Sequence, residues 1–223
     1  MKKIFPFEVF DIIPCPDGII LSQKELFNGT SYKVSFLQYS VITGKLSPVT
    51  KDFYQLNKFG ENYAKICEEI GDYISCEATV FKNGSVAVVY SSGETGIFDA
   101  SGKPVWTGDL IYKDCPINGA VADGVYFWTT VPLQNSIINY SIPHKKFSMR
   151  IGSENSTTFS EPVSLSIYRK EMFVCNAGSN KIRKVSLSNY LVSDYKRFDE
   201  PVYKYIRSAL KEFVILSSGV YVL

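Results

Sequence analysis

The chain has 223 residues, of which 45% are hydrophobic and 21% are charged, with a formal net charge of +2. This composition excludes extended disorder, and the nearly balanced charge argues against nucleic acid or a membrane surface as a partner. No apolar run approaches the roughly 18 residues of a membrane-spanning helix, and MKKIFPF is a poor secretory signal. Five scattered cysteines without a CxxC pair fit reduced thiols, so we expect a cytoplasmic protein.

From the amino terminus onward, the chain predicts short β-strands separated by turn signals such as PDG, KNG, ADG and AGSN. One helical pattern interrupts them at residues 59–73, where Tyr63, Ile66, Cys67 and Ile70 fall on one face. We expect this short helical insertion to be a flap over the rest of the fold. The alternative is an element that binds a partner or a second copy of the chain.

Five segments share one pattern, in which an apolar β-run is followed by small polar residues. They are PCPDGIILSQ (14–23), ATVFKNGSVAVVYSSG (78–93), GAVADGVYFWTT (119–130), SLSIYRKEMFVCNAG (164–178) and YIRSALKEFVILSS (205–218). Their apolar runs begin 67, 39, 47 and 41 residues apart, and the longest gap contains the helical pattern. A period of about 40–45 residues with four short strands per unit is typical of a β-propeller.

We therefore predict an all-β fold, a five-bladed β-propeller that forms a single domain over residues 1–223. The last repeat lacks one strand, so we expect the N-terminal strand at residues 1–7 to complete it and remove an open edge. A β-sandwich or an open barrel is the alternative, but neither requires the period or the complementary ends. The predicted repeats are approximately 8–51, 74–110, 111–152, 153–198 and 199–223.

The segment MFVCNAGSNKIRKVSLSN, at residues 172–189, resembles the propeller repeats of the tyrosine-valine-threonine-asparagine (YVTN) type and the related quinoprotein-like family. It has their apolar strand, Asn, small turn, alternating strand and polar turn. The segment GIFDASGK, at residues 96–103, is similar to the Asp-x-x-Gly-Lys hairpin of the same repeats. These motifs are structural, so the resemblance implies the fold and no particular activity.

In a propeller, the loops that enter each first strand and leave each second strand share one face, around the mouth of the central channel. Here they are rich in small polar residues, which predicts a concave polar site for a ligand. The alternative is that such residues are ordinary turn formers. The candidate ligand-binding residues are Glu77, Ser91, Ser92, Trp128, Thr129, Asn176, Asn180, Glu161, Glu200 and Ser217.

The sequence favours a non-enzymatic binding or interaction module that takes a small polar ligand, a glycan or a peptide at this face. The alternative is a carbohydrate-active enzyme that uses Glu161 and Glu200, with Glu77 as a third carboxylate, because glycosidases need paired carboxylates. We expect no cofactor, no nucleic acid or membrane partner, and a monomer or weak homodimer.

Histidine-based and metal-based chemistry has weak support in the sequence. The single histidine, His144, lies in a predicted outer hairpin, which removes His triads and multi-histidine metal sites. Cys15, Cys76 and Cys115 recur near predicted strand entries, and three thiols at matching positions are the one metal-site alternative. We expect no metal.

Overall fold

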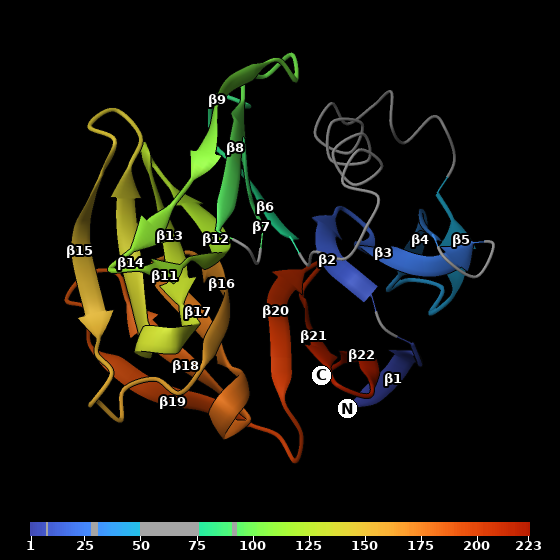
Figure 1. The fold of residues 1–223 in the computed structure, drawn as a ribbon. Coiled ribbons are helices and arrows are strands. Elements are labelled where there is room, and N and C mark those ends of the chain that lie inside the picture. Colours follow the sequence, from blue (N-terminus) through green and yellow to red (C-terminus); the bar gives the residue numbers. More distant parts are fainter. Residues whose placement is uncertain (8, 28–30, 50–75, 91–92) are drawn as a thin grey trace. The chain divides into compact units, whose positions relative to one another are not determined.

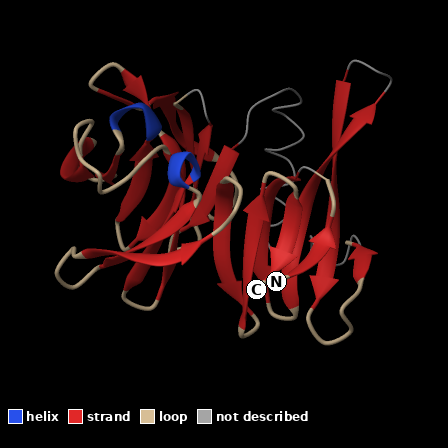
Figure 2. Cartoon of the chain, turned by 90° about the horizontal axis from the view of Figure 1, so that it is seen from below, coloured by secondary structure: helices blue, strands red, loops and turns tan. Residues whose placement is uncertain are grey.

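The computed structural model describes residues 1–7, 9–27, 31–49, 76–90 and 93–223. Within these ranges nearly all regular structure is β-strand, and the helical elements are two single 3₁₀ turns (Figure 2). The predicted helical insertion at residues 59–73 lies outside the described residues. The all-β prediction is confirmed.

Most described strands belong to five four-stranded antiparallel sheets, each built from strands that are consecutive in the chain apart from the last. This is the architecture of a five-bladed β-propeller, as the repeats predict. Blade 1 is β2 (Val9–Cys15), β3 (Gly18–Phe27), β4 (Ser31–Ser40) and β5 (Leu46–Pro48). Blade 2 is β6 (Cys76–Val80), β7 (Val86–Tyr90), β8 (Glu94–Phe98) and β9 (Pro104–Asp109).

The next two blades have the same order of strands. Blade 3 is β12 (Asn118–Asp123), β13 (Tyr126–Val131), β14 (Ser136–Ser141) and β15 (Lys146–Gly152). Blade 4 is β16 (Pro162–Tyr168), β17 (Glu171–Asn176), β18 (Lys181–Ser186) and β19 (Val192–Arg197). A two-stranded ribbon, β10 (Ile111–Tyr112) and β11 (Cys115–Pro116), connects blade 2 to blade 3.

The last blade takes a strand from each end of the chain. Its members are β20 (Val202–Ser208), β21 (Lys211–Leu216), β22 (Gly219–Val222) and β1 (Lys2–Phe5), and β1 pairs antiparallel with β22 (Figure 1). A Cβ at Gly219 would overlap the Phe5 carbonyl oxygen, so this glycine permits the close approach of the two strands. The predicted closure by the N-terminal strand is confirmed, and it covers an edge of β22 that would otherwise be unpaired.

The chain divides into two compact units, one of Met1–Ser75 with Ile206–Leu223 and the other of Cys76–Tyr205. The boundary falls inside β20, between Tyr205 and Ile206. The first unit has its own apolar core, in which the rings of Tyr39 and Phe213 meet edge to face with centroids 6.1 Å apart. This core is composed of Phe5, Ile12, Ile19, Leu21, Tyr39, Ile206, Phe213, Ile215 and Val220.

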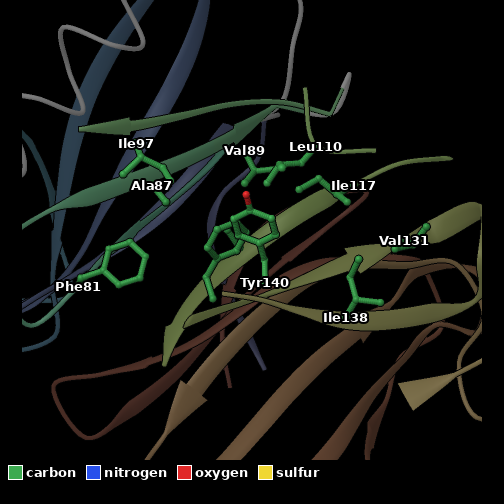
Figure 3. Packing of buried hydrophobic residues seen from close by; sticks show 11 residues of the cluster. Phe81, Ala87, Val89, Ile97, Leu110, Ile117, Val131, Ile138 and Tyr140 are labelled. Carbon is green, nitrogen blue, oxygen red and sulfur yellow. The ribbon is translucent and has the colours of Figure 1, made fainter. Parts of the chain in front are cut away.

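The second unit contains blades 2, 3 and 4 and two apolar clusters. One cluster lies where blades 2 and 3 face each other, with Ala87 and Val89 of β7 opposite Ile138 and Tyr140 of β14 (Figure 3). The other joins blades 3 and 4 through Trp128, Ile137, Phe159, Leu165, Met172, Val174 and Val185. Both faces of blade 3 are therefore packed, which explains why all of β14 is buried.

No helix among the described residues has both the length and the apolar character needed to cross a membrane.

Candidate functional site

Blades 3 and 4 have similar loops at the end of the sheet where the second strand finishes. After β13 and β17 the chain makes one 3₁₀ turn, η1 (Pro132–Gln134) and η2 (Ala177–Ser179). Each turn ends on an asparagine in the left-handed region, Asn135 at φ 46° and Asn180 at φ 55°. Asparagine tolerates this conformation better than most residues. The predicted ligand residue Asn180 therefore has a backbone role.

The backbone of Glu161 connects these two loops. Its N–H donates to the Asn135 side-chain oxygen at 2.9 Å, and its carbonyl accepts from the Ala177 N–H at 3.0 Å. Glu161 is exposed and has a left-handed φ of 50°. Glu200, at the matching position before β20, is partly buried and has no positive φ. The two predicted carboxylates thus occupy different backbone environments.

The Thr129 side chain hydrogen-bonds to the backbone of the neighbouring strand in its own sheet. It is fully buried, and its hydroxyl is shared between the carbonyl oxygens of Asn118 at 2.9 Å and Gly119 at 2.7 Å. The neighbouring Thr130 hydroxyl also donates to Asn118. These bonds lie at the register shift between β12 and β13, where ladder pairing is interrupted. The prediction of Thr129 as a ligand residue lacks support, because its hydroxyl satisfies buried backbone groups.

Asn176 is the predicted residue with the most unusual setting at this end. It is the last residue of β17, pairs with Pro162 across the sheet, and is almost completely buried. Its side-chain oxygen accepts no hydrogen bond from the described residues. An unsatisfied buried amide oxygen costs about 1–3 kcal/mol, so Asn176 remains a candidate for polar contact.

The other predicted residues do not add to this group. Ser91 and Ser92 lie outside the described residues. Glu77 lies in β6 opposite Val89. Ser217 is an exposed residue in the turn between β21 and β22, in the first compact unit. The structure therefore brings together Glu161 and Asn176 within blade 4, because Pro162 pairs with Asn176 and the Ala177 N–H donates to the Glu161 carbonyl.

Trp128, predicted to contact a ligand at the channel mouth, lies near the β12–β13 hairpin of blade 3. It lies inside β13, two residues after the β12–β13 hairpin, and its side chain is 2% exposed. Alternation along the strand sends Phe127 into the cluster with blade 2 and Trp128 into the cluster with blade 4. The indole N–H donates to the Asp123 carboxylate at 3.4 Å.

Beside Trp128, at the hairpin end of blade 3, is an open cavity of about 670 Å³. It is formed by the β12–β13 hairpin, by β14 and β15, and by the turn after β18 of blade 4. The lining residues are Asp123, Gly124, Val125, Tyr126, Trp128, Asn139, Ser148, Met149 and Tyr190. We call this the hairpin cavity. Its volume lies within the range of small-molecule sites.

Backbone and side-chain hydrogen bonds hold the walls of the hairpin cavity. Tyr190 adopts φ 59°, and its N–H donates to the Ser186 carbonyl at 2.7 Å. This turn places the Tyr190 ring 6.0 Å from the Trp128 ring, centroid to centroid, with 47° between the planes. On the opposite wall, Ser148 donates to the side-chain oxygen of the buried Asn139 at 2.8 Å.

Sequence reasoning missed the hairpin cavity, although part of its signal is visible. The run ADGVYFW places three aromatic residues directly after a two-residue turn, and SLSNY places a tyrosine at the end of a polar turn. Gly124 has φ 67°, as a hairpin with glycine at the first turn position requires. Nothing in the sequence pairs these two segments, because they are about 65 residues apart and belong to different repeats.

The cysteine alternative is wrong in its premise. Cys15 ends β2, at the turn into β3, whereas Cys76 begins β6. Burial raises the pKa of the Cys15 thiol. Within the described ranges, no three His, Cys, Asp or Glu residues are grouped closely enough to hold a metal ion. His144 lies exposed in the β14–β15 turn.

No family model and no curated protein matches this chain. Solved structures do match. A catalytically inactive virginiamycin B lyase from Staphylococcus aureus, solved with quinupristin, has a TM-score of 0.52 at 12% identity. The alignment covers 94% of this chain and 63% of the lyase, so the chain spans less than two thirds of that protein's length.

Two further structures show the same likeness. A computationally designed protein, Ika4, has a TM-score of 0.50 at 12% identity, over 68% of this chain and 91% of its own. The WD40 repeats of RRP9 have a TM-score of 0.50 at 11% identity, over 96% of this chain and 62% of theirs. The neighbours include a propeller of the YVTN/quinoprotein-like type, so the predicted resemblance is confirmed at the level of the fold. At these identities the likeness shows the β-propeller fold alone.

Proposed function

We propose that this protein is a non-enzymatic binding module and that its ligand site is the hairpin cavity. The observation that carries the proposal is the combination found there. Two exposed aromatic rings, Tyr126 and Tyr190, share one open cavity with the Asp123 carboxylate, and the buried Trp128 forms part of its wall. Aromatic faces supply stacking area, and a few polar groups fix orientation, which is the usual composition of a small-molecule site.

Rigid walls favour binding at this site. The Tyr190 turn and the β12–β13 hairpin are already hydrogen-bonded, so little conformational freedom is lost when a ligand enters. A small polar molecule, a glycan or a peptide side chain fits this description. All three have polar groups to orient them and a flat or apolar part to stack.

The alternative of a glycoside hydrolase receives less support. Hydrolysis of a glycosidic bond requires two carboxyl groups, about 5–10 Å apart, on either side of the bond. The lining of the hairpin cavity supplies one, Asp123. The predicted carboxylate Glu161 is bonded through its backbone to Asn135, which follows η1 at the other end of blade 3.

The test uses the two tryptophans. In a Trp106→Phe variant, Trp128 is the single tryptophan, so its emission reports on the hairpin cavity. We expect small polar ligands, glycans and peptides that bind to change this emission, and Tyr190→Leu to weaken that response. Tyr203→Leu is the matched control, because Tyr203 is 44% exposed and Tyr190 is 41% exposed.

Each outcome of this screen bears on the proposal. A saturable response that Tyr190→Leu weakens and Tyr203→Leu leaves unchanged supports it. No response from any ligand class, or a response that Tyr190→Leu does not alter, overturns the assignment of the hairpin cavity. Turnover of a glycan that Glu161→Gln abolishes would contradict a non-enzymatic role.

A further inference from the structure

The hairpin cavity has an uncompensated negative charge. Among the residues that the structure describes, Asp123 is the one acidic residue that lines it, and neither lysine nor arginine does. In the described part of the chain, the hydrogen bond to the Asp123 carboxylate comes from the neutral Trp128 indole. Lys145 and Lys146 lie in the next hairpin of the same blade but do not line the cavity. A ligand that enters the cavity therefore lies beside a carboxylate that no lysine or arginine of the lining neutralises.

The aromatic rings add to the same preference. The face of an aromatic ring carries negative charge density, so it attracts a cation placed over it. Tyr126 and Tyr190 are both partly exposed at the cavity, and the Trp128 ring contacts that of Tyr190. A carboxylate and aromatic faces together favour a cation that is flat and weakly hydrated. A guanidinium group has both properties, whereas an ammonium group is compact and strongly hydrated.

We propose that the hairpin cavity binds the guanidinium group of an arginine side chain presented by a partner peptide. This inference rests on the proposed function and names its ligand class. The planar group stacks on Tyr190 or Tyr126 and donates two parallel hydrogen bonds to the Asp123 carboxylate. The exposed side chains of Val125 and Leu191, 56% and 69% exposed, flank these residues in the chain and offer apolar contact to the rest of the peptide.

The test compares two blocked tripeptides of nearly the same shape, one with a charged and one with a neutral side chain. One carries arginine between two leucines, and the other carries citrulline, in which a neutral urea replaces the guanidinium. Binding is measured by Trp128 emission in the Trp106→Phe variant and by calorimetry on the unaltered protein. We expect the arginine peptide to bind at least about tenfold more tightly than the citrulline peptide. Added salt is expected to reduce this difference, because the charges meet in an open cavity.

Matched variants assign the preference to the cavity. Asp123→Asn keeps an oxygen for the Trp128 N–H but removes the charge, so it is expected to reduce the arginine preference to less than about threefold. Asp109→Asn removes an exposed carboxylate at the end of β9 and is expected to leave the preference unchanged. Tyr190→Leu is expected to weaken binding of both peptides.

The outcomes separate this inference from the proposed function. Equal binding of both peptides, or a preference that Asp123→Asn preserves, overturns arginine recognition while leaving the cavity as a binding site. Free arginine that binds as tightly as the arginine peptide overturns the peptide as its source. A neutral monosaccharide that binds with dependence on Tyr190, while the arginine peptide does not bind, supports the proposed function and overturns the inference. No binding by any probe overturns both.

Discussion

The two ends of blade 3 use polar residues in opposite ways. At the end where β13 finishes, Thr129 bonds to the backbone of β12 and Asn135 bonds to the backbone of Glu161. At the hairpin end, Asp123 and the aromatic rings of Tyr126 and Tyr190 line an open cavity. Polar residues at a strand end are therefore not a site by themselves. The difference lies in exposure: the Thr129 hydroxyl is buried against backbone partners, whereas the Asp123 carboxylate is exposed at a cavity.

The largest expected effect is on stability, and it distinguishes the buried Trp128 from the exposed Tyr190 in the lining of the hairpin cavity. Trp128→Ala removes a fully buried indole from the cluster between blades 3 and 4, so we expect unfolding to become easier by about 3–5 kcal/mol. Tyr190→Ala, with a partly exposed ring, should cost much less. Chemical denaturation of both variants measures this. Equal losses would contradict the assignment of Trp128 to the core.

The next effect tests whether Thr129 is structural. Thr129→Val keeps the shape but leaves the carbonyl oxygens of Asn118 and Gly119 without this donor, which should cost about 1–3 kcal/mol of stability. Thr107→Val, at an exposed position of β9, is the matched control and should change little. A Thr129→Val variant that is as stable as the unaltered protein but no longer binds ligand would instead show that Thr129 has a role in binding.

A smaller effect is expected at Asn135. Asn135→Ala loses both the acceptor for the Glu161 N–H and the tolerance of a left-handed backbone, at a cost of about 1–2 kcal/mol. Asn135→Gly loses the acceptor but keeps the conformation, so its melting temperature should lie between those of Asn135→Ala and the unaltered protein. Identical melting of both variants would show that the left-handed conformation contributes nothing.

The smallest effect depends on pH and concerns Tyr140, on the face of blade 3 that packs against blade 2. Burial raises the pKa of its phenol above the ordinary value of 10.0. Below that value both states keep the proton, whereas at higher pH the unfolded chain loses it first, and stability falls until the native group also ionises. Tyr140→Phe should therefore lose less stability than the unaltered protein as the pH rises above about 10. If the urea midpoints of Tyr140→Phe and of the unaltered protein change equally with pH, ionisation of Tyr140 does not contribute to this loss of stability.

Much of the fold was predictable because its signals are local and repeated. Turn residues such as Gly124 and alternating apolar residues recur with one period, and each repeat forms a sheet of consecutive strands. The pairing of residues 1–7 with β22 was predictable from the missing strand of the last repeat. This pairing joins the two ends of the chain, but the number of strands in each repeat was enough to predict it.

The candidate site was predicted less well, because local patterns do not reveal how a polar group is satisfied. The recurrence of Asn135 and Asn180 is visible in the sequence, yet their left-handed backbones explain it without a ligand. The sequence indicates Trp128 as a stacking residue at the channel mouth, and the structure places it in β13, beside the hairpin cavity. Its neighbour in the cavity, Tyr190, belongs to another repeat.

By itself, the sequence determined the all-β class, the five repeats and the closure of the last blade, because these follow from periodicity and turn chemistry within short segments. Only the tertiary structure decided which side chains pack in the core or bond to the backbone and which line a cavity. That outcome depends on the packing of blade 3 against blade 4, which brings the β12–β13 hairpin beside the Tyr190 turn. Contacts between distant segments are set by the shape of whole sheets, and no single repeat contains that information.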